Sequence, residues 1–168
     1  MRRCGAVLPR ILPLRKVDLL PRYLEDLTPG LVFTGGPLAI TEQDIVEFGR
    51  QFDPQYFHTD PQTADFSFFA GLAASGWHTA ALSMRMAVES PLNDFADGLI
   101  GIEVRSLRWP RPTRPGDILR LNLEVLETRP SRSRPGWGTA VVRWTTLNQS
   151  DEIVMTAEPV IWVARRPD

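Results

Sequence analysis

Hydrophobic and polar positions alternate in one segment near residue 35 and again throughout the C-terminal half of the chain. Such alternation is typical of strands with one buried face. Residues 31–40 alternate loosely around Gly35 and Gly36, which predicts a strand with a bulge or a close backbone approach at the glycines. Four later segments are also expected to be strands: 99–109, 118–126, 139–148 and 153–163. Turn-like joints separate these four strands, so we expect an antiparallel meander.

The segment between the first strand and the meander has helix signals instead. Thr41 is a typical N-cap in front of an acidic first turn, and apolar or small residues at helical spacing extend to Phe52. Asp60 followed by Pro61 predicts a second, short helix, since proline is well tolerated at the first helical position.

A longer helix is expected from Trp77 to Val88, where Ala, Leu and Met predominate. Ser75 is its candidate cap, and Pro91 lies beyond its end. Three aromatic residues precede it and are expected to belong to the core: Phe66, Phe68 and Phe69. The order of strand, helices and then strands predicts an α+β fold with the long helix as its buried central element.

With 168 residues the chain fits one domain, expected at residues 21–168. Residues 1–20 combine arginines with a short apolar stretch broken by prolines, so we expect a poorly ordered extension and no targeting peptide. The single cysteine, Cys4, favours a reducing compartment, the cytoplasm. A net charge of −1 argues against a nucleic-acid or membrane-surface protein, and no apolar run is long enough for a transmembrane helix.

The stretch from Phe52 to Pro61, FDPQYFHTDP, contains the strongest candidate chemistry. Pro54 disfavours helix at Asp53, which is therefore expected at a helix exit, with His58 following on a bent, non-helical segment. A carboxylate and an imidazole placed in this way can hold one water molecule for general acid–base catalysis, which contributes about 10²–10⁴-fold for each well-placed group. On spacing alone, a structural explanation is favoured, in which Asp53 caps the turn and His58 bonds the backbone.

Ser75 and Gly76, just before the long helix, form a second candidate site. The first backbone N–H groups of a helix lack internal partners, so a glycine there lets a carbonyl oxygen approach and be polarised. A plain N-cap explains the same two residues and is favoured on spacing alone. His78, in the first turn of the same helix, is a candidate ligand or base, although a half-buried helix residue is the favoured interpretation.

Two histidines, one cysteine and no clustered carboxylates argue against a metal site, and no cofactor-binding loop is recognisable. Arginines concentrate instead in two loops: Arg111 and Arg114 in the first, and Arg129, Arg132 and Arg134 in the second. Two interpretations fit them. The loops are solvated, or they contact an anionic group such as the phosphates of a thioester carrier.

Four stretches, taken in order, resemble the MaoC-like acyl dehydratases and are similar to the (R)-specific enoyl-CoA hydratases: FDPQYFHTDP, SGWHTAALSMRM, RPTRPGD and LNLEVLETRPSRSRPGWG. The resemblance extends from about residue 31 to residue 163. It implies a hot-dog fold, in which a curved antiparallel sheet wraps the long helix. It also implies a homodimer with its acyl tunnel and active site at or near the subunit interface.

The resemblance also implies roles for individual residues. The hydratase motif of the family has an Asp, four intervening residues and a His, which Asp53 and His58 match. The glycine that opens the central helix and polarises the thioester carbonyl falls on Gly76. Where the family commonly has His-Gly-Met, this chain has a Ser-Gly-Trp sequence that keeps the backbone donor and changes the pocket wall. The side chains expected to contact substrate are Phe57, Ser75, Trp77 and Arg114.

The implied function is reversible addition of water to a trans-2-enoyl thioester of CoA or an acyl carrier protein, giving the (R)-3-hydroxyacyl product. Asp53 and His58 would hold the water, with the base and the acid not assigned between them. Two alternatives on the same fold stay open. One is a thioesterase that directs water at the carbonyl carbon, and the other is a non-catalytic subunit that binds acyl thioesters.

Overall fold

The structure, a computed structural model, describes residues 21–167, so the expected N-terminal extension lies outside the described residues. Its centre is one antiparallel sheet of five strands in the order β1-β3-β4-β5-β2. The strands are β1 (Val32–Ala39), β2 (Ile100–Arg108), β3 (Ile118–Pro130), β4 (Trp137–Leu147) and β5 (Ile153–Ala164). As predicted, β1 is irregular, with a register shift between Gly35 and Leu38.

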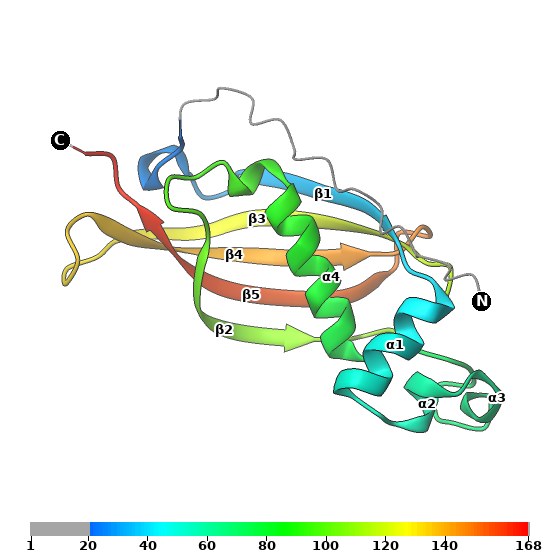
Figure 1. The fold of residues 1–168 in the computed structure, drawn as a ribbon. Coiled ribbons are helices and arrows are strands. Elements are labelled where there is room, and N and C mark those ends of the chain that lie inside the picture. Colours follow the sequence, from blue (N-terminus) through cyan, green and yellow to red (C-terminus); the bar gives the residue numbers. More distant parts are fainter. Residues whose placement is uncertain (1–20, 168) are drawn as a thin grey trace, which may run out of the picture.

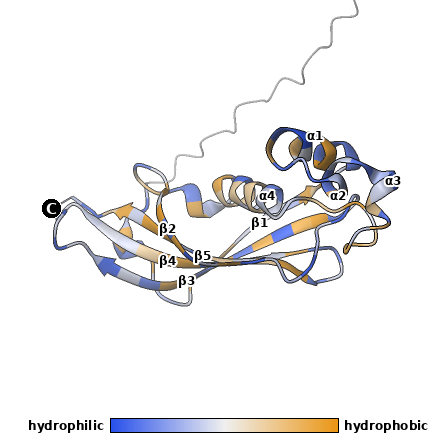
Figure 2. Ribbon diagram, turned by 90° about the horizontal axis from the view of Figure 1, so that it is seen from below, coloured by the Kyte–Doolittle hydropathy of each residue, from blue (hydrophilic) through white to orange (hydrophobic). Residues whose placement is uncertain are grey.

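One long helix crosses a single face of this sheet, and three shorter helices gather at one end of the molecule (Figures 1 and 2). They are α1 (Glu42–Phe52), α2 (Tyr56–Thr59), α3 (Pro61–Ala64) and the long helix α4 (Gly76–Glu89), with short 3-10 turns at Leu24–Asp26 and Pro91–Asn93. A curved antiparallel sheet around α4 is the α+β hot-dog arrangement that the family resemblance implies. No helix within residues 21–167 is long and apolar enough to span a bilayer.

The main core lies between α4 and the sheet. Met86 and Ala87 of α4 are fully buried against apolar side chains of the strands, among them Leu121 and Leu123 of β3 and Val142 of β4. Burying each large apolar side chain stabilises the fold by about 1.5–3 kcal/mol. The alternation read from the sequence of β3 therefore reports a real buried face.

A second, smaller cluster supports the helical end of the molecule. Its buried members come from the start of α1, from α3 and from the loop before α4: Ile40, Ile45, Ala64, Leu72 and Ala74. Because this cluster joins α1 to the loop that precedes α4, it fixes the relative positions of the segments that carry Asp53, His58 and Gly76.

The predicted starts of α1 and α3 are confirmed. The Asp44 amide donates to Thr41 Oγ1 at 3.1 Å, and the Thr41 amide donates to the Asp44 carboxylate at 2.8 Å, which is a capping box. The Asp60 carboxylate accepts from the Gln62 amide at 3.0 Å at the start of α3. Thus local polar residues determine where these helices begin.

Two expectations about this end of the molecule were wrong. His58 does not lie on a non-helical segment, because Tyr56–Thr59 form the one-turn helix α2. Phe66 and Phe68 do not belong to the core, since they are 91% and 98% exposed. The turns after α3 direct both rings outward, while Phe69 packs on Phe57 at a ring distance of 5.2 Å.

The expected four-stranded meander was also wrong in one respect. β3, β4 and β5 follow one another, but β2 pairs with β5 at the opposite edge of the sheet from β1. The connection from β2 to β3 contains three prolines, which lack N–H donors and do not favour a tight hairpin. Instead it passes the first turn of α4, where Thr79 Oγ1 donates to Thr113 Oγ1 at 2.9 Å.

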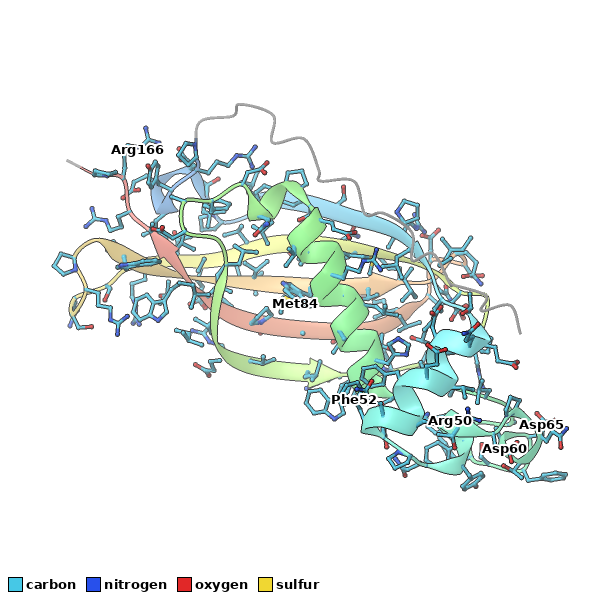
Figure 3. All side chains as sticks on the ribbon, viewed as in Figure 1. Arg50, Phe52, Asp60, Asp65, Met84 and Arg166 are labelled. Carbon is cyan, nitrogen blue, oxygen red and sulfur yellow. The ribbon has the colours of Figure 1, made fainter. Side chains whose placement is uncertain are left out.

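The apolar face of β2 is exposed in the single chain. Ile100, Ile102 and Val104 are 43%, 46% and 55% exposed. Beside them runs a groove of about 350 Å³, whose lining includes Met84 of α4 and Ile161 of β5. Figure 3 shows Met84 beside α4, away from the end of the molecule that Phe52, Asp60 and Asp65 mark.

Candidate active site

Asp53 and His58 meet at the helical end of the molecule. Asp53 is the C-cap of α1, and the following Pro54 prevents the helix from continuing, so the chain turns directly into α2 and His58. The His58 Nε2 atom lies 3.4 Å from Asp53 Oδ2. The spacing between Asp53 and His58, which on its own favoured a structural turn, therefore brings a carboxylate and an imidazole together.

The His58 ring is buried and held in one orientation. Its Nδ1 atom lies 2.6 Å from the carbonyl oxygen of Ala73, which can only accept, so Nδ1 carries a proton. The Phe57 ring packs against the imidazole in a T-shaped arrangement at 4.6 Å. In the neutral imidazole, Nε2 is consequently unprotonated and faces Asp53.

A glycine on α1 permits this placement. A Cβ atom at Gly49 would lie 2.6 Å from the backbone oxygen of His58, which is too close for any other residue without a backbone shift. The absence of a side chain at Gly49 thus lets α2 pack directly on α1.

Two donors hold the Asp53 carboxylate. Ser75 Oγ donates to Oδ2 at 2.7 Å, and Gln55 Nε2 donates to Oδ1 at 2.8 Å. Burial raises the pKa of Asp53, but these two hydrogen bonds and the positive charge available at His58 outweigh it, so the pKa lies below its ordinary value. Asp53 is therefore ionised at neutral pH and acts as an acceptor.

Gly76 opens α4 next to this pair. Ser75 is the N-cap, and its Oγ also accepts from the Trp77 amide at 3.3 Å. The Gly76 N–H, at the first helical position, bonds no acceptor among residues 21–167. A Cβ atom at Gly76 would lie 2.7 Å from the Trp109 ring, so the indole packs directly on the helix start.

His58 and Gly76 line one cavity of about 420 Å³. Its walls also include Phe69, Thr79, Trp109, Arg111 and Arg114. Asp53 is not among the lining residues and reaches the cavity through its contact with His58. The site therefore combines a half-buried carboxylate and a buried imidazole with a free helix N–H at a cavity wall.

The other residues expected to contact substrate take different positions. Phe57 packs behind His58, whereas Trp77 is 63% exposed and contacts Trp109 edge to face at 5.6 Å. Arg114 lines the cavity, but its guanidinium donates to backbone carbonyls of residues 69–72. Arg111, at the rim, forms an ion pair with Glu152 at 3.2 Å.

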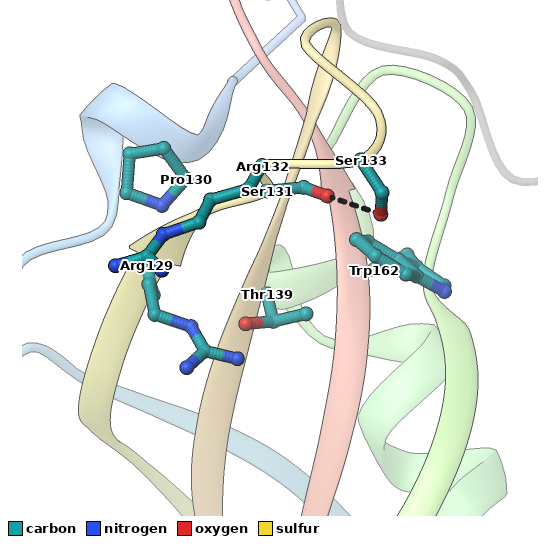
Figure 4. A pocket seen from close by; sticks show the side chains of 7 residues that line it. All are labelled: Arg129, Pro130, Ser131, Arg132, Ser133, Thr139 and Trp162. Atoms are coloured by element: carbon teal, nitrogen blue, oxygen red, sulfur yellow. Dashed lines mark hydrogen bonds between the residues drawn. The ribbon is translucent and has the colours of Figure 1, made fainter.

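The two arginine-rich loops lie far apart. Arg129 and Arg132 line a separate hollow of about 420 Å³ on the β3–β4 hairpin, together with Trp162 (Figure 4). This hairpin lies at the opposite end of the sheet from α1 (Figure 1). Hence Arg129 and Arg132 lie away from the cavity that His58 and Gly76 line.

His78 takes no part in this pair. Its ring is buried and stacks on Phe48 of α1 at 4.4 Å, and its Nδ1 atom has no partner among the described residues. Burial lowers its pKa, which the nearby Asp44 carboxylate opposes. Residues 21–167 contain no group of three or more His, Cys, Asp or Glu side chains able to hold a metal ion.

Sequence reasoning missed three contributors to the site. Gln55 and the Ala73 carbonyl orient Asp53 and His58, and Trp109 covers the start of α4. Gln55 was adjacent to the motif and offered a weak signal. The other two could not be found, because a backbone carbonyl carries no sequence signature and Trp109 comes from the end of β2.

Comparisons with known proteins agree with this arrangement. The MaoC like domain family model matches residues 29–146. The uncharacterized protein YdeM of Bacillus subtilis is 33% identical over 143 residues, which cover 84% of this chain and 99% of that protein. The crystal structure of a MaoC-like dehydratase from Rhodospirillum rubrum is 44% identical, with a TM-score of 0.83 over 88% of this chain and 99% of that chain.

A second solved structure, the R-hydratase PhaJ1 from Pseudomonas aeruginosa, is 25% identical with a TM-score of 0.67 and covers 86% of this chain and 86% of that chain. The family model matches well over half of the chain, and the Bacillus relative aligns over nearly its whole length. With its five-stranded antiparallel sheet wrapped around α4, this chain belongs to the MaoC-like dehydratase family of hot-dog proteins.

Proposed function

We propose that this protein adds water reversibly to a trans-2-enoyl thioester and forms the (R)-3-hydroxyacyl product. The observation that carries the proposal is the 3.4 Å approach of Asp53 to His58 beside the first backbone N–H of α4. The similarity to an R-hydratase supports the same reaction class. The proposed reaction needs no redox cofactor, because hydration of an enoyl thioester involves no net oxidation.

The fixed tautomer of His58 limits how the proton moves. Nδ1–H is bonded to the Ala73 carbonyl, and the neutral ring offers only the Nε2 lone pair. Ionised Asp53 is likewise an acceptor, so one water molecule can donate a hydrogen bond to each group. Neither group holds a proton for the substrate before water binds. The proton delivered to Cα is therefore one that the pair has taken from the water.

The reaction then follows from the position of Gly76. The water oxygen bonds to Cβ as its proton passes to the Asp53–His58 pair, and the double-bond electrons move toward the thioester oxygen. The Gly76 N–H stabilises the resulting negative charge, and one such donor is worth about 10²–10³-fold in rate. The pair returns the proton to Cα from the same face, which completes a syn addition.

The acyl and carrier parts of the substrate are proposed from the surroundings of the pair. Trp77 is kept as a substrate-facing residue, because its exposed ring contacts Trp109 in the cavity wall. Ser75 acts next to the substrate through its bonds to Asp53 and the helix start. Phe57 packs behind His58 and supports its ring. The proposed carrier of the acyl group is CoA or an acyl carrier protein. The predicted location of the protein is the cytoplasm.

A homodimer is part of the proposal. Within residues 21–167, β2 is an edge strand that pairs with β5 on one side only, and its apolar side chains are exposed. Long, apolar edge strands are normally covered by another strand. Pairing of two β2 strands would cover Ile102 and Val104 and place the groove beside Met84 at the subunit interface.

The proposed reaction is tested with crotonyl-CoA. Hydration removes the enoyl absorbance while free thiol stays constant, and chiral analysis of the product should give the (R) isomer. Release of free CoA from a saturated acyl-CoA would instead identify a thioesterase. Thermal stabilisation by acyl-CoA without turnover of either thioester would identify a non-catalytic binding subunit, and both results would overturn the proposal.

A further inference from the structure

We propose that Arg114 is a positioning residue that holds the His58 imidazole in its working tautomer through the backbone of residues 69–73. In this proposal the Arg114 guanidinium does not contact a charged group of the substrate. The link to catalysis rests on the proposed hydratase function, whereas the effect on His58 does not. The two can therefore fail separately.

The guanidinium of Arg114 is directed at three carbonyl groups of one short segment. Nη1 donates to the oxygens of Gly71 and Leu72 at 3.0 and 3.1 Å, and Nη2 donates to the oxygen of Phe69. Within residues 21–167 Arg114 forms no ion pair with a carboxylate. Its donors therefore bind backbone, and hydrogen bonds from a charged donor are the stronger kind.

The segment that Arg114 holds has no helix or strand to stabilise it. Ala70 and Gly71 have φ angles of 47° and 136°, in the left-handed region that an alanine rarely adopts. Such a conformation persists only where its surroundings impose it. The planar fork of Arg114 supplies that constraint, since it satisfies carbonyls on both sides of the left-handed pair.

The restrained segment leads directly to His58. Ala73 follows Leu72, and its carbonyl oxygen lies 2.6 Å from His58 Nδ1, while its amide donates to the Phe57 oxygen at 3.1 Å. The next amide, that of Ala74, donates to the Thr113 oxygen at 2.9 Å. Displacement of residues 69–73 would thus remove the acceptor that keeps the proton on Nδ1 of His58.

Arg114 is itself firmly anchored. Its amide donates to Asp117 Oδ2 at 2.7 Å, and Asp117 Oδ1 accepts from Gln149 Nε2 at 3.1 Å. Asp117 is buried, as is the neighbouring Thr113, which contacts Thr79 of α4. The arginine therefore connects His58 to the same turn that passes the start of α4, so both halves of the site share one support.

The expected consequence is a change in the proton position on His58. With the Ala73 carbonyl displaced, the neutral ring would exchange between the Nδ1–H and Nε2–H forms. The Nε2–H form cannot accept a proton from water at the atom that faces Asp53. A misplacement of about 1 Å at such a site can cost about 10²-fold in rate. Lysine would replace the guanidinium only in part, because its ammonium cannot reach the three carbonyls with the same planar geometry.

The test uses histidine labelled with ¹⁵N in the full chain, which contains only two histidines. His78→Gln assigns the two rings. In the wild type with a neutral His58 ring, Nδ1 should carry the proton and Nε2 should not. Arg114→Ala should give mixed tautomers and lower kcat by about 10–100-fold with little change in KM. Arg114→Lys should give an intermediate tautomer mixture.

Arg143→Ala is the matched control. Arg143 bonds Glu158 and Glu124 on the sheet, so its removal also deletes a multiply bonded arginine but should leave the His58 spectrum unchanged. If Arg114→Ala does not fold, Arg114→Lys carries the test. An unchanged His58 tautomer in the folded variant, or a rise in KM alone, would overturn the proposal. Absence of any hydratase activity in the wild type would remove the proposed function and leave the spectral test intact.

Discussion

The Ser75 hydroxyl lies 2.7 Å from the Asp53 carboxylate, although 22 residues separate them in the chain. The same hydroxyl caps α4, so one side chain connects the acid–base pair to the helix start that carries the Gly76 N–H. Reaction at Cβ and charge at the thioester oxygen occur a few atoms apart in an enoyl thioester. A fixed connection between the two halves of the site suits that geometry.

Replacement of Ser75 by Ala should move the acid limb of the activity profile to higher pH. The Ser75 hydrogen bond lowers the pKa of Asp53, so its loss raises that pKa and the ionised form disappears sooner as pH falls. Because hydrogen bonds to charged groups contribute about 1.5–3 kcal/mol, kcat/KM at neutral pH should fall about tenfold or more. Ser83→Ala, in the same helix but bonded to Thr146, is the control and should leave the limb in place.

Gly76→Ala should remove activity by displacing the helix start. The added methyl would lie 2.7 Å from the Trp109 ring, so either the indole or the first turn of α4 must shift. We expect a loss of about 10²–10³-fold in kcat and a destabilisation of about 1–3 kcal/mol. Gly136→Ala in the β3–β4 hairpin, where a Cβ meets open space, is the matched substitution. Equal activity in the two variants would exclude Gly76 from the site.

Stability should fall as pH drops below 6.5 because of His78. Burial holds its folded-state pKa below the ordinary 6.5, so the unfolded chain binds a proton first as the solution is acidified. The stability that the neutral, buried His78 ring contributes is lost as pH falls toward its folded-state pKa. Over that range the unfolding free energy changes by at most about 1.4 kcal/mol per pH unit. His78→Phe, which keeps the stack on Phe48, should flatten the dependence of the unfolding free energy measured in urea from pH 7.5 to 5.5. An equal slope in both proteins would contradict this assignment.

A charge on the exposed face of β2 should separate the proposed dimer. The wild type should sediment as two chains of 18.9 kDa, and Ile102→Lys should sediment as one. Ile153→Lys places the same charge at a similarly exposed position on β5 and should remain dimeric. A monomeric wild type would contradict the proposed interface directly.

Local signals in the sequence predicted the elements of this fold well. Thr41 and Asp60 cap helices as expected, and the alternation in β3 corresponds to buried and exposed positions. Strand order was less accessible, since β2 pairs with β5 through contacts between residues far apart in the chain. The exposed Phe66 and Phe68 show the same limit, because composition does not tell which way a turn directs a ring.

The sequence likewise predicted only part of the candidate site. Asp53, His58 and Gly76 belong to short motifs whose residue types indicate their chemistry. The contacts that fix them do not follow from such motifs: Ala73 acts through its backbone, and Arg114 reaches three carbonyls more than 40 residues away in sequence. The positive charge of Arg114 in a loop suggested an anionic ligand. In the structure its guanidinium instead donates to backbone carbonyls of residues 69–72.

The role of Asp53 and His58 is tested by the rate at which Asp53→Asn and His58→Gln hydrate crotonyl-CoA. Each variant replaces a group that can take a proton from water with a neutral amide of similar size, so kcat should fall by about 10²–10⁴-fold. Circular dichroism and thermal unfolding should show that both variants remain folded. Wild-type rates in both folded variants would show that this pair does not activate water.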